Sequence, residues 1–115
     1  MVTLYGIPNC DTVKKARTWL ADNNIEFTFH DFRKDGLSAA QVDTWLADLG
    51  CDTLVNKRST SWKTLSEEVK TSLNNASASS LVLASPTLIK RPLLDRDGSF
   101  SVGFKVADYE TLFNQ

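Results

Sequence analysis

The sequence of 115 residues is poor in the residues that mark special classes of protein, with two cysteines, one histidine and one methionine. Cys10 and Cys51 lie far apart and match neither a disulfide framework nor a zinc-ligand spacing. No apolar run approaches the roughly 20 residues that span a bilayer, and the first residues lack the basic and apolar regions of a secretory signal. We therefore expect no metal site, no membrane association and a reducing, cytoplasmic setting.

The sequence also lacks an excess of charge of either sign. Thirteen Lys and Arg side chains stand against 14 Asp and Glu side chains, a formal net charge of −1. Such a balance provides no general attraction to nucleic acid, so any anion site must be local. Hydrophobic residues make up 42% of the chain and charged residues 23%, which is typical of a globular protein of single-domain size. We expect one domain over residues 1–115, no nucleic-acid partner and a monomer.

The stretch around Cys10 carries the functional interpretation. An apolar run over residues 2–6 predicts a strand, Pro8 and Asn9 end it, and a helical pattern begins at Asp11. This order places the Cys10 thiol at a helix N-terminus, where unpaired N–H groups and the macrodipole favour an anion. Because the thiolate is the reactive form of cysteine, Cys10 is a candidate nucleophile. The alternative is a buried, inert cysteine.

The first half of the chain predicts a β-α-β unit followed by a capped helix. A helix over residues 11–23 connects strands over 2–6 and 25–32, and such strands lie parallel. Ser38 and Gln41 then form a capping-box pattern, which opens a helix that ends near Gly50. His30, Trp19, Trp45 and Trp62 are interpreted as packing residues, and Cys51 as a small buried one.

The second half predicts a helical middle and a β-β-α end. The middle is predicted to contain short helices over residues 54–58, 62–70 and 79–84 and an exposed segment over 74–80. A hairpin turn at Asp97–Gly98 then leads into a strand over 99–104. A helix over 109–113, capped by Asp108, comes last. This order is typical of a thioredoxin-like α/β fold with a mixed sheet and a helical insertion. In that fold a cis proline enters the third strand, and Pro92 is the candidate.

Three separated motifs resemble the arsenate reductase (ArsC)/Spx-type family, and within it the YffB-like branch. They are Pro8–Thr12, Asn56–Arg58 and Pro86–Pro92. In that family the cysteine attacks arsenate or exchanges with disulfides, and arginines bind the oxyanion. The resemblance therefore implies that Cys10 is the nucleophile and that Arg58 and Arg91 bind the anion.

The resemblance adds further positions to the predicted anion and substrate site. Asn9, Thr12 and Pro92 adjoin the cysteine or the arginine in their motifs, and Lys105 is the simplest match to a third basic position. Thr12 either donates to the thiolate or is an ordinary first-turn residue. For the two arginines, the alternatives are a solvated surface side chain at Arg58 and a salt bridge to an acid such as Asp95 at Arg91.

Two departures from the family pattern direct the functional prediction. Val13 replaces the second cysteine of a C-x-x-C motif, so Cys10 needs an external thiol. Asp11 replaces a glycine, and its carboxylate repels an oxyanion. We therefore predict a monothiol oxidoreductase without a bound cofactor, reduced by glutathione or a glutaredoxin and acting on a small oxyanion or thiol substrate. The alternatives are an arsenate reductase, an Spx-type regulator that binds RNA polymerase, and a non-catalytic anion- or peptide-binding module.

Overall fold

Four strands form one mixed sheet in the order β2-β1-β3-β4. In this computed structural model, which describes residues 2–114, the strands are β1 (Val2–Gly6), β2 (Phe27–Asp31), β3 (Leu93–Arg96) and β4 (Ser99–Val102). As predicted, β1 and β2 are parallel, whereas β3 is antiparallel to both β1 and β4. The described chain divides into two compact units, residues 2–34 with 91–114 and residues 35–90.

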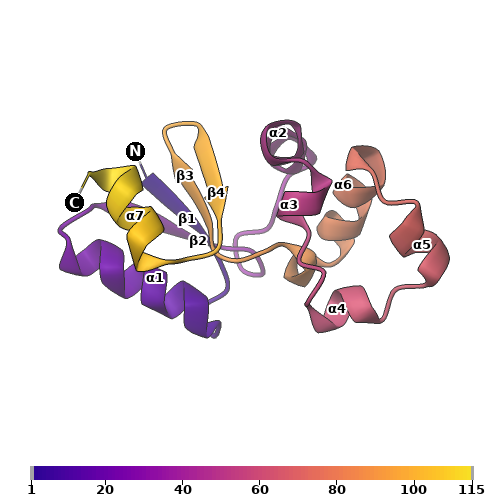
Figure 1. Cartoon of the computed structure of the whole chain (residues 1–115), viewed down its shortest axis with the longest axis horizontal. Helices are drawn as coiled ribbons and strands as arrows, with labels where there is room; N and C mark the ends of the chain where they lie inside the picture. Colours follow the sequence, from indigo (N-terminus) through magenta and orange to yellow (C-terminus); the bar gives the residue numbers. More distant parts are fainter. Residues whose placement is uncertain (1, 115) are drawn as a thin grey trace. The chain divides into compact units, whose positions relative to one another are not determined.

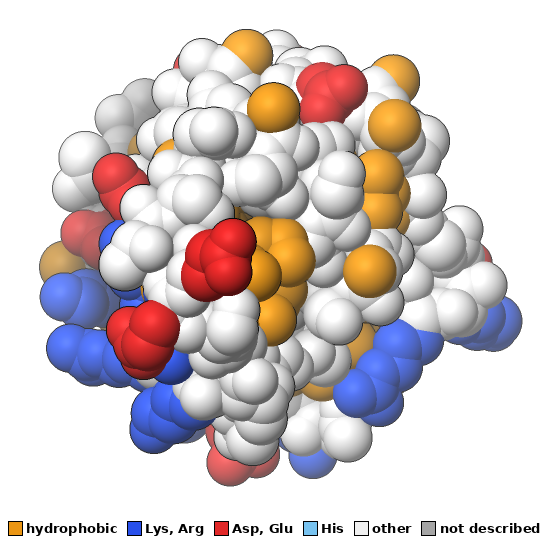
Figure 2. Space-filling view, turned by 90° about the vertical axis from the view of Figure 1, so that its right-hand side faces the viewer, with side chains coloured by type: hydrophobic (Ala, Val, Ile, Leu, Met, Phe, Trp, Pro, Cys, Tyr) orange, Lys and Arg blue, Asp and Glu red, His pale blue; other side chains and the backbone are white. Residues whose placement is uncertain are grey.

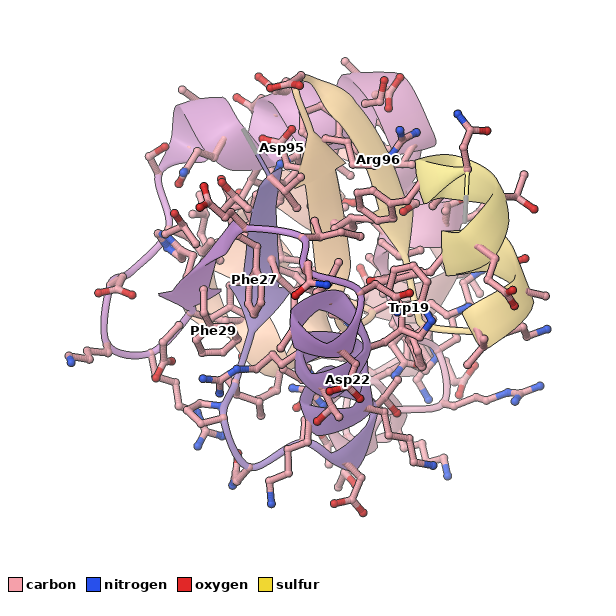
Figure 3. The ribbon with its side chains drawn as sticks, turned by 90° about the vertical axis from the view of Figure 1, so that its left-hand side faces the viewer. Trp19, Asp22, Phe27, Phe29, Asp95 and Arg96 are labelled. Atoms are coloured by element: carbon pink, nitrogen blue, oxygen red, sulfur yellow. The ribbon has the colours of Figure 1, made fainter. Side chains whose placement is uncertain are left out.

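The first unit contains the sheet and two helices, α1 (Asp11–Asp22) and α7 (Val106–Phe113) (Figure 1). One cluster of buried side chains joins them, with Leu4 and Leu94 from the sheet, Ala16 and Leu20 from α1, and Tyr109 from α7. These α1 positions recur at helical spacing, which explains why this face of α1 is buried. Trp19 lies on the side of α1 that faces α7 (Figure 3).

The second unit is helical. It contains α2 (Ala39–Leu49), α3 (Cys51–Leu54), α4 (Thr60–Lys63), α5 (Glu67–Thr71), α6 (Asn75–Ala84) and the 3-10 helix η1 (Pro86–Leu88). Its buried side chains include Val42, Trp45 and Leu46 of α2 and Ala78 and Val82 of α6. Backbone atoms and side chains that are neither hydrophobic nor charged cover most of the face shown in Figure 2, on which the hydrophobic areas are small.

Two local signals are confirmed by the structure. At the start of α2, the Gln41 backbone N–H donates to Ser38 Oγ at 3.1 Å and the Ser38 N–H donates to Gln41 Oε1 at 3.1 Å, which is a capping box. Asp97 and Gly98 have φ values of 52° and 91°, as a two-residue hairpin turn between antiparallel strands requires.

The predicted helices in the middle of the chain are right in part. The helix predicted over 79–84 lies within α6, whereas the helix predicted over 62–70 is divided into α4 and α5. Val55 forms an isolated bridge with Ile89, so residues 55–58 are not helical. The segment 74–80 belongs to α6, because the Asn74 side chain accepts the Ser77 N–H at 2.8 Å and caps the helix. Serine and asparagine favour loops and caps equally, and here the cap prevails.

The last helix also begins earlier than predicted. Lys105 is the N-cap of α7 and Asp108 lies in its first turn, where an acidic side chain complements the dipole without capping. The strand predicted over residues 99–104 ends at Val102. The α/β fold with a mixed sheet is nevertheless confirmed, and none of the helices in residues 2–114 has the length and apolar character to cross a membrane.

Candidate active site

The strand pairing brings the predicted site segments of the first unit to one end of the sheet. Tyr5, near the end of β1, pairs with Leu93 at the start of β3, and Leu93 pairs in turn with Val102 at the end of β4. Cys10 follows β1, Arg91 and Pro92 precede β3, and Lys105 follows β4. Residues far apart in the sequence therefore lie at the same sheet end because of this register.

Cys10 is the N-cap residue of α1, as the sequence predicts. Its backbone is extended, with φ −93° and ψ 124°, and its carbonyl accepts the Lys14 N–H at 3.0 Å. The Cys10 N–H donates to the Ile7 carbonyl at 3.3 Å, which closes the loop after β1. The side chain is half-buried and the thiol is free. Cys10 is therefore not the fully buried cysteine of the alternative interpretation.

A tight contact between β1 and α1 holds this helix start in place. Val13 is fully buried, and a Cβ atom built on Gly6 would lie 2.8 Å from Val13 Cγ2. Glycine is therefore required at the end of β1 for α1 to approach the sheet this closely. The helical spacing predicts Val13 on the buried face of α1, together with Ala16 and Leu20, but does not indicate its contact with Gly6. The sequence signal for this packing is the glycine at the end of the strand that precedes the helix.

Arg91 precedes Pro92 through a cis peptide bond, which confirms the predicted cis proline. The buried Nη1 atom of Arg91 has no hydrogen-bond partner among the described residues. Asp95, the predicted alternative partner, instead accepts the Gly98 N–H at 2.8 Å. Pro92 is buried, and its carbonyl accepts the Gly103 N–H at 2.9 Å. A buried, unpaired guanidinium nitrogen favours an anionic ligand, because leaving a buried donor unpaired is costly.

Other predicted positions differ in exposure. Asn9 and Lys105 are exposed, and Thr12 is half-buried in the first turn of α1. Within residues 2–114, no hydrogen bond joins the Thr12 hydroxyl to the Cys10 thiol, so the role of Thr12 as a donor stays a prediction. Asp11 is exposed in the same turn, where its carboxylate complements the helix dipole.

Arg58 lies in the second unit, on the loop before α4. Its side chain is exposed, and its backbone N–H donates to Asn56 Oδ1 at 3.0 Å. The neighbouring Lys57 pairs with Asp52 at 3.0 Å and lies over the Trp62 ring. The structure thus gives Arg58 the exposure of a solvated arginine, and its part in an anion site stays a prediction.

The remaining interpretations of single residues have mixed outcomes. His30 packs on Tyr5 with a ring separation of 4.8 Å, as expected for a strand residue. Cys51 is half-buried rather than buried. It is the first residue of α3, and its backbone N–H donates to Asn75 Oδ1. Among the described residues no group of three or more His, Cys, Asp or Glu side chains is placed to hold a metal ion.

Comparison with known sequences now identifies the family. The sequence model of the ArsC family matches residues 5–112. This chain belongs to the ArsC family. It is 50% identical to an uncharacterized protein of Haemophilus influenzae, over 98% of this chain and 99% of that protein. It is also 30% identical to the global transcriptional regulator Spx 1 of Oceanobacillus iheyensis, over 90% of this chain and 80% of the regulator.

Solved structures of ArsC-family relatives show the same fold. A structure named YffB protein superposes with a TM-score of 0.91 at 40% identity, over 96% of this chain and 97% of that one. An arsenate reductase (ArsC) related protein from Brucella melitensis gives a TM-score of 0.81 at 48% identity, over 99% of this chain and 95% of that one. The thioredoxin-like fold predicted from the sequence is confirmed.

Proposed function

We propose that this ArsC-family protein is a cytoplasmic monothiol oxidoreductase that uses glutathione or a glutaredoxin as its reductant. The observation that carries the proposal is the unpaired, buried Arg91 nitrogen at the sheet end where Cys10 is the N-cap residue of α1. A guanidinium beside a helix N-terminus stabilises a thiolate and binds a carboxylate or oxyanion.

The reaction consists of three thiol–disulfide exchanges. The Cys10 thiolate attacks one sulfur of a disulfide substrate, a new S–S bond forms, and the other sulfur leaves as a thiolate with the electron pair. A glutathione thiolate then attacks the mixed disulfide and releases the Cys10 thiolate. The glutathione is left in a mixed disulfide with the substrate sulfur, and a second glutathione thiolate attacks this disulfide and releases the substrate thiolate. The net result is two electrons moved from two glutathione molecules, which end as oxidised glutathione, to the substrate disulfide, whose released thiolates take up protons from solvent.

Val13 determines that the second thiol comes from another molecule. The side chain at this position is fully buried against Gly6 and carries no sulfur. Cys51 lies after α2 in the chain, in the unit that does not contain Cys10. A disulfide needs Cα atoms closer than about 7 Å, so we do not expect Cys51 to serve as the resolving thiol. The mixed disulfide should therefore persist until an external thiol attacks it.

The test is treatment of the full chain with oxidised glutathione, followed by intact mass measurement. We expect one glutathione adduct that is absent in Cys10→Ser, retained in Cys51→Ser and removed by glutaredoxin. An internal Cys10–Cys51 disulfide, or an adduct on Cys51 in place of Cys10, would contradict the proposal.

Arsenate reduction is a second candidate, because the Brucella relative is named an arsenate reductase related protein. The exposed Asp11 carboxylate in the first turn of α1 opposes an oxyanion at the thiol. If arsenate is the substrate, glutathione-coupled arsenite release should exceed that of Cys10→Ser, and Asp11→Gly should increase it. A regulatory role of the Spx kind requires binding to RNA polymerase, which a pull-down with purified polymerase tests.

A further inference from the structure

A groove of about 400 Å³ lies between α1 and the start of α7, within the unit that carries Cys10. Its floor is apolar and is formed by Trp19, Phe104 and Val106. Val106 is 49% exposed, and among residues 2–114 it is the one large hydrophobic residue that is exposed. The groove therefore offers an apolar surface in the same unit as Cys10.

The floor of this groove is held rigid by Tyr109. The Tyr109 ring makes edge-on contacts with Trp19 at 5.5 Å and with Phe104 at 4.6 Å between ring centroids. Tyr109 is 1% exposed and lies in the core of the unit. Since a rigid floor loses little entropy on binding, the two rings form a prepared surface for an apolar side chain.

The groove has a basic end and an acidic end. Lys14 and Lys15 line it at the start of α1, and Asp22 lines it at the last turn (the helix end is labelled in Figure 3). Both lysines are exposed, and neither forms an ion pair within residues 2–114. The Lys14 N–H donates to the Cys10 carbonyl, so the basic end is one helical turn from the thiol.

We propose that this groove binds an acidic, cysteine-bearing protein segment and so makes disulfide-bonded proteins of this kind the substrates of Cys10. The carboxylates of the segment pair with Lys14 and Lys15 next to the reacting sulfur. An apolar side chain further along packs on the floor of Trp19, Phe104 and Val106. The opposite charge at Asp22 fixes the direction of the segment.

The dimensions fit such a segment better than a small thiol. From Lys14 to Asp22 the helix rises roughly 12 Å, which an extended peptide covers in about four residues. Glutathione supplies carboxylates but no apolar side chain for the floor. The proposal rests on the proposed function, because it names the substrate class for the same thiol. Glutathione keeps its role as the reductant.

The experiment uses short peptides whose single cysteine is activated as a pyridyl disulfide. Cys10 thiolate attacks the peptide sulfur, the S–S bond to the pyridine breaks, and the released thiopyridone is measured by its absorbance. Three peptides are compared, and each is made in both chain directions. Beside the cysteine, the first peptide carries two glutamates and a leucine. The second replaces the glutamates by lysines, and the third replaces the leucine by serine. The neutral pyridyl disulfide of mercaptoethanol measures the reactivity of the thiol alone. All proteins carry Cys51→Ser, and Cys10→Ser gives the background.

We expect the glutamate–leucine peptide to react about tenfold faster than either of the other two peptides, relative to the small disulfide. In Lys14→Glu/Lys15→Glu the preference should reverse toward the lysine peptide. In Val106→Ser the advantage of leucine over serine should shrink while the charge preference remains. Circular dichroism confirms that each variant is folded.

The matched control is Arg33→Glu/Lys34→Glu. These residues are also adjacent, basic and exposed, they follow β2 at the carboxyl end of the parallel strands, and they do not line the groove. The control variant should keep the preference for glutamate, because the net-charge change alone does not act through the groove.

Equal relative rates for all peptides, with a reactive small disulfide, would overturn the groove and leave the proposed function standing. An equal loss of preference in the control variant would also overturn the groove, because a general field would then explain it. Failure of the small disulfide to react with Cys10 would overturn the proposed function and the groove with it.

Discussion

Tyr109 is a buried phenol whose hydroxyl has no hydrogen-bond partner among the described residues. Burial raises the pKa of Tyr109 above its usual range, because the charged form would lose its hydration. A pKa raised in the folded state means that the stability linked to this group is fully present below the unfolded value of about 10 and is lost as pH rises above it.

We predict that Tyr109→Phe is as stable as the parent or more stable, by up to about 1 kcal/mol at pH 8, because the substitution removes an unpaired buried hydroxyl. Between pH 9 and 11 the parent should lose stability faster than the variant, by at most about 1.4 kcal/mol per pH unit. Urea denaturation across this pH range measures both effects. A variant clearly less stable at pH 8 would mean that the hydroxyl has a partner.

The contact between Gly6 of β1 and Val13 of α1 sets how closely the cysteine helix approaches the sheet. Gly6→Ala would place a methyl group 2.8 Å from Val13 Cγ2, and we predict a loss of about 1–3 kcal/mol of stability. Val13→Ala should destabilise by leaving a cavity. In the double variant the two losses should partly cancel in urea denaturation. Additive losses would show that the contact does not limit the packing.

The proposed redox chemistry depends on the same helix start. Val13→Cys restores a second sulfur one turn after Cys10, and a cysteine there can attack the mixed disulfide from within the same chain. We therefore predict that the oxidised-glutathione treatment of this variant yields an internal disulfide instead of a lasting adduct. Intact mass under denaturing conditions distinguishes the two products, and Val13→Ser is the matched control. A persistent adduct in Val13→Cys would contradict the view that Val13 alone makes this protein monothiol.

The two predicted anion-binding arginines belong to different units, Arg58 to residues 35–90 and Arg91 to the unit with the sheet. We predict that Arg91→Ala weakens oxyanion binding about 10- to 100-fold, since a charge-assisted contact is worth about 1.5–3 kcal/mol. The measurement is the degree to which bound sulfate or arsenate protects Cys10 from an alkylating reagent. Lys105→Ala should have a smaller effect, because its side chain is exposed.

Arg58→Ala and the double variant complete a thermodynamic cycle. If both arginines bind one anion, the double variant should lose less or more than the sum of the single losses. Additive effects, or no effect of Arg58→Ala, would indicate that Arg58 is the solvated surface residue that its exposure also allows. Equal and negligible effects of all three replacements would place the anion site elsewhere.

The sequence by itself determined the parts of this protein that local chemistry decides. The strand–loop–helix order around Cys10, the Ser38–Gln41 capping box and the Asp97–Gly98 turn follow from residues within a few positions of one another. The order of the predicted strands and helices indicated the fold and, with it, the cis bond before Pro92, and the resemblance of three separated motifs to a known family implied the site residues. The helix predicted over residues 79–84 lies within α6, but the start of α6 at Asn75 was missed, because serine and asparagine suit loops and helix caps equally well.

The tertiary structure decided what depends on contacts between distant residues. The register of β1 with β3, and of β3 with β4, brings Arg91, Pro92 and Lys105 to the end of the sheet where Cys10 lies. Packing between α1 and α7 creates the groove of Trp19 and Phe104, which no sequence pattern indicates. From spacing alone, a side chain can be predicted only to be buried or exposed. Its neighbours are set by the packing of other elements against it rather than by local propensity, and those neighbours decide what it can do.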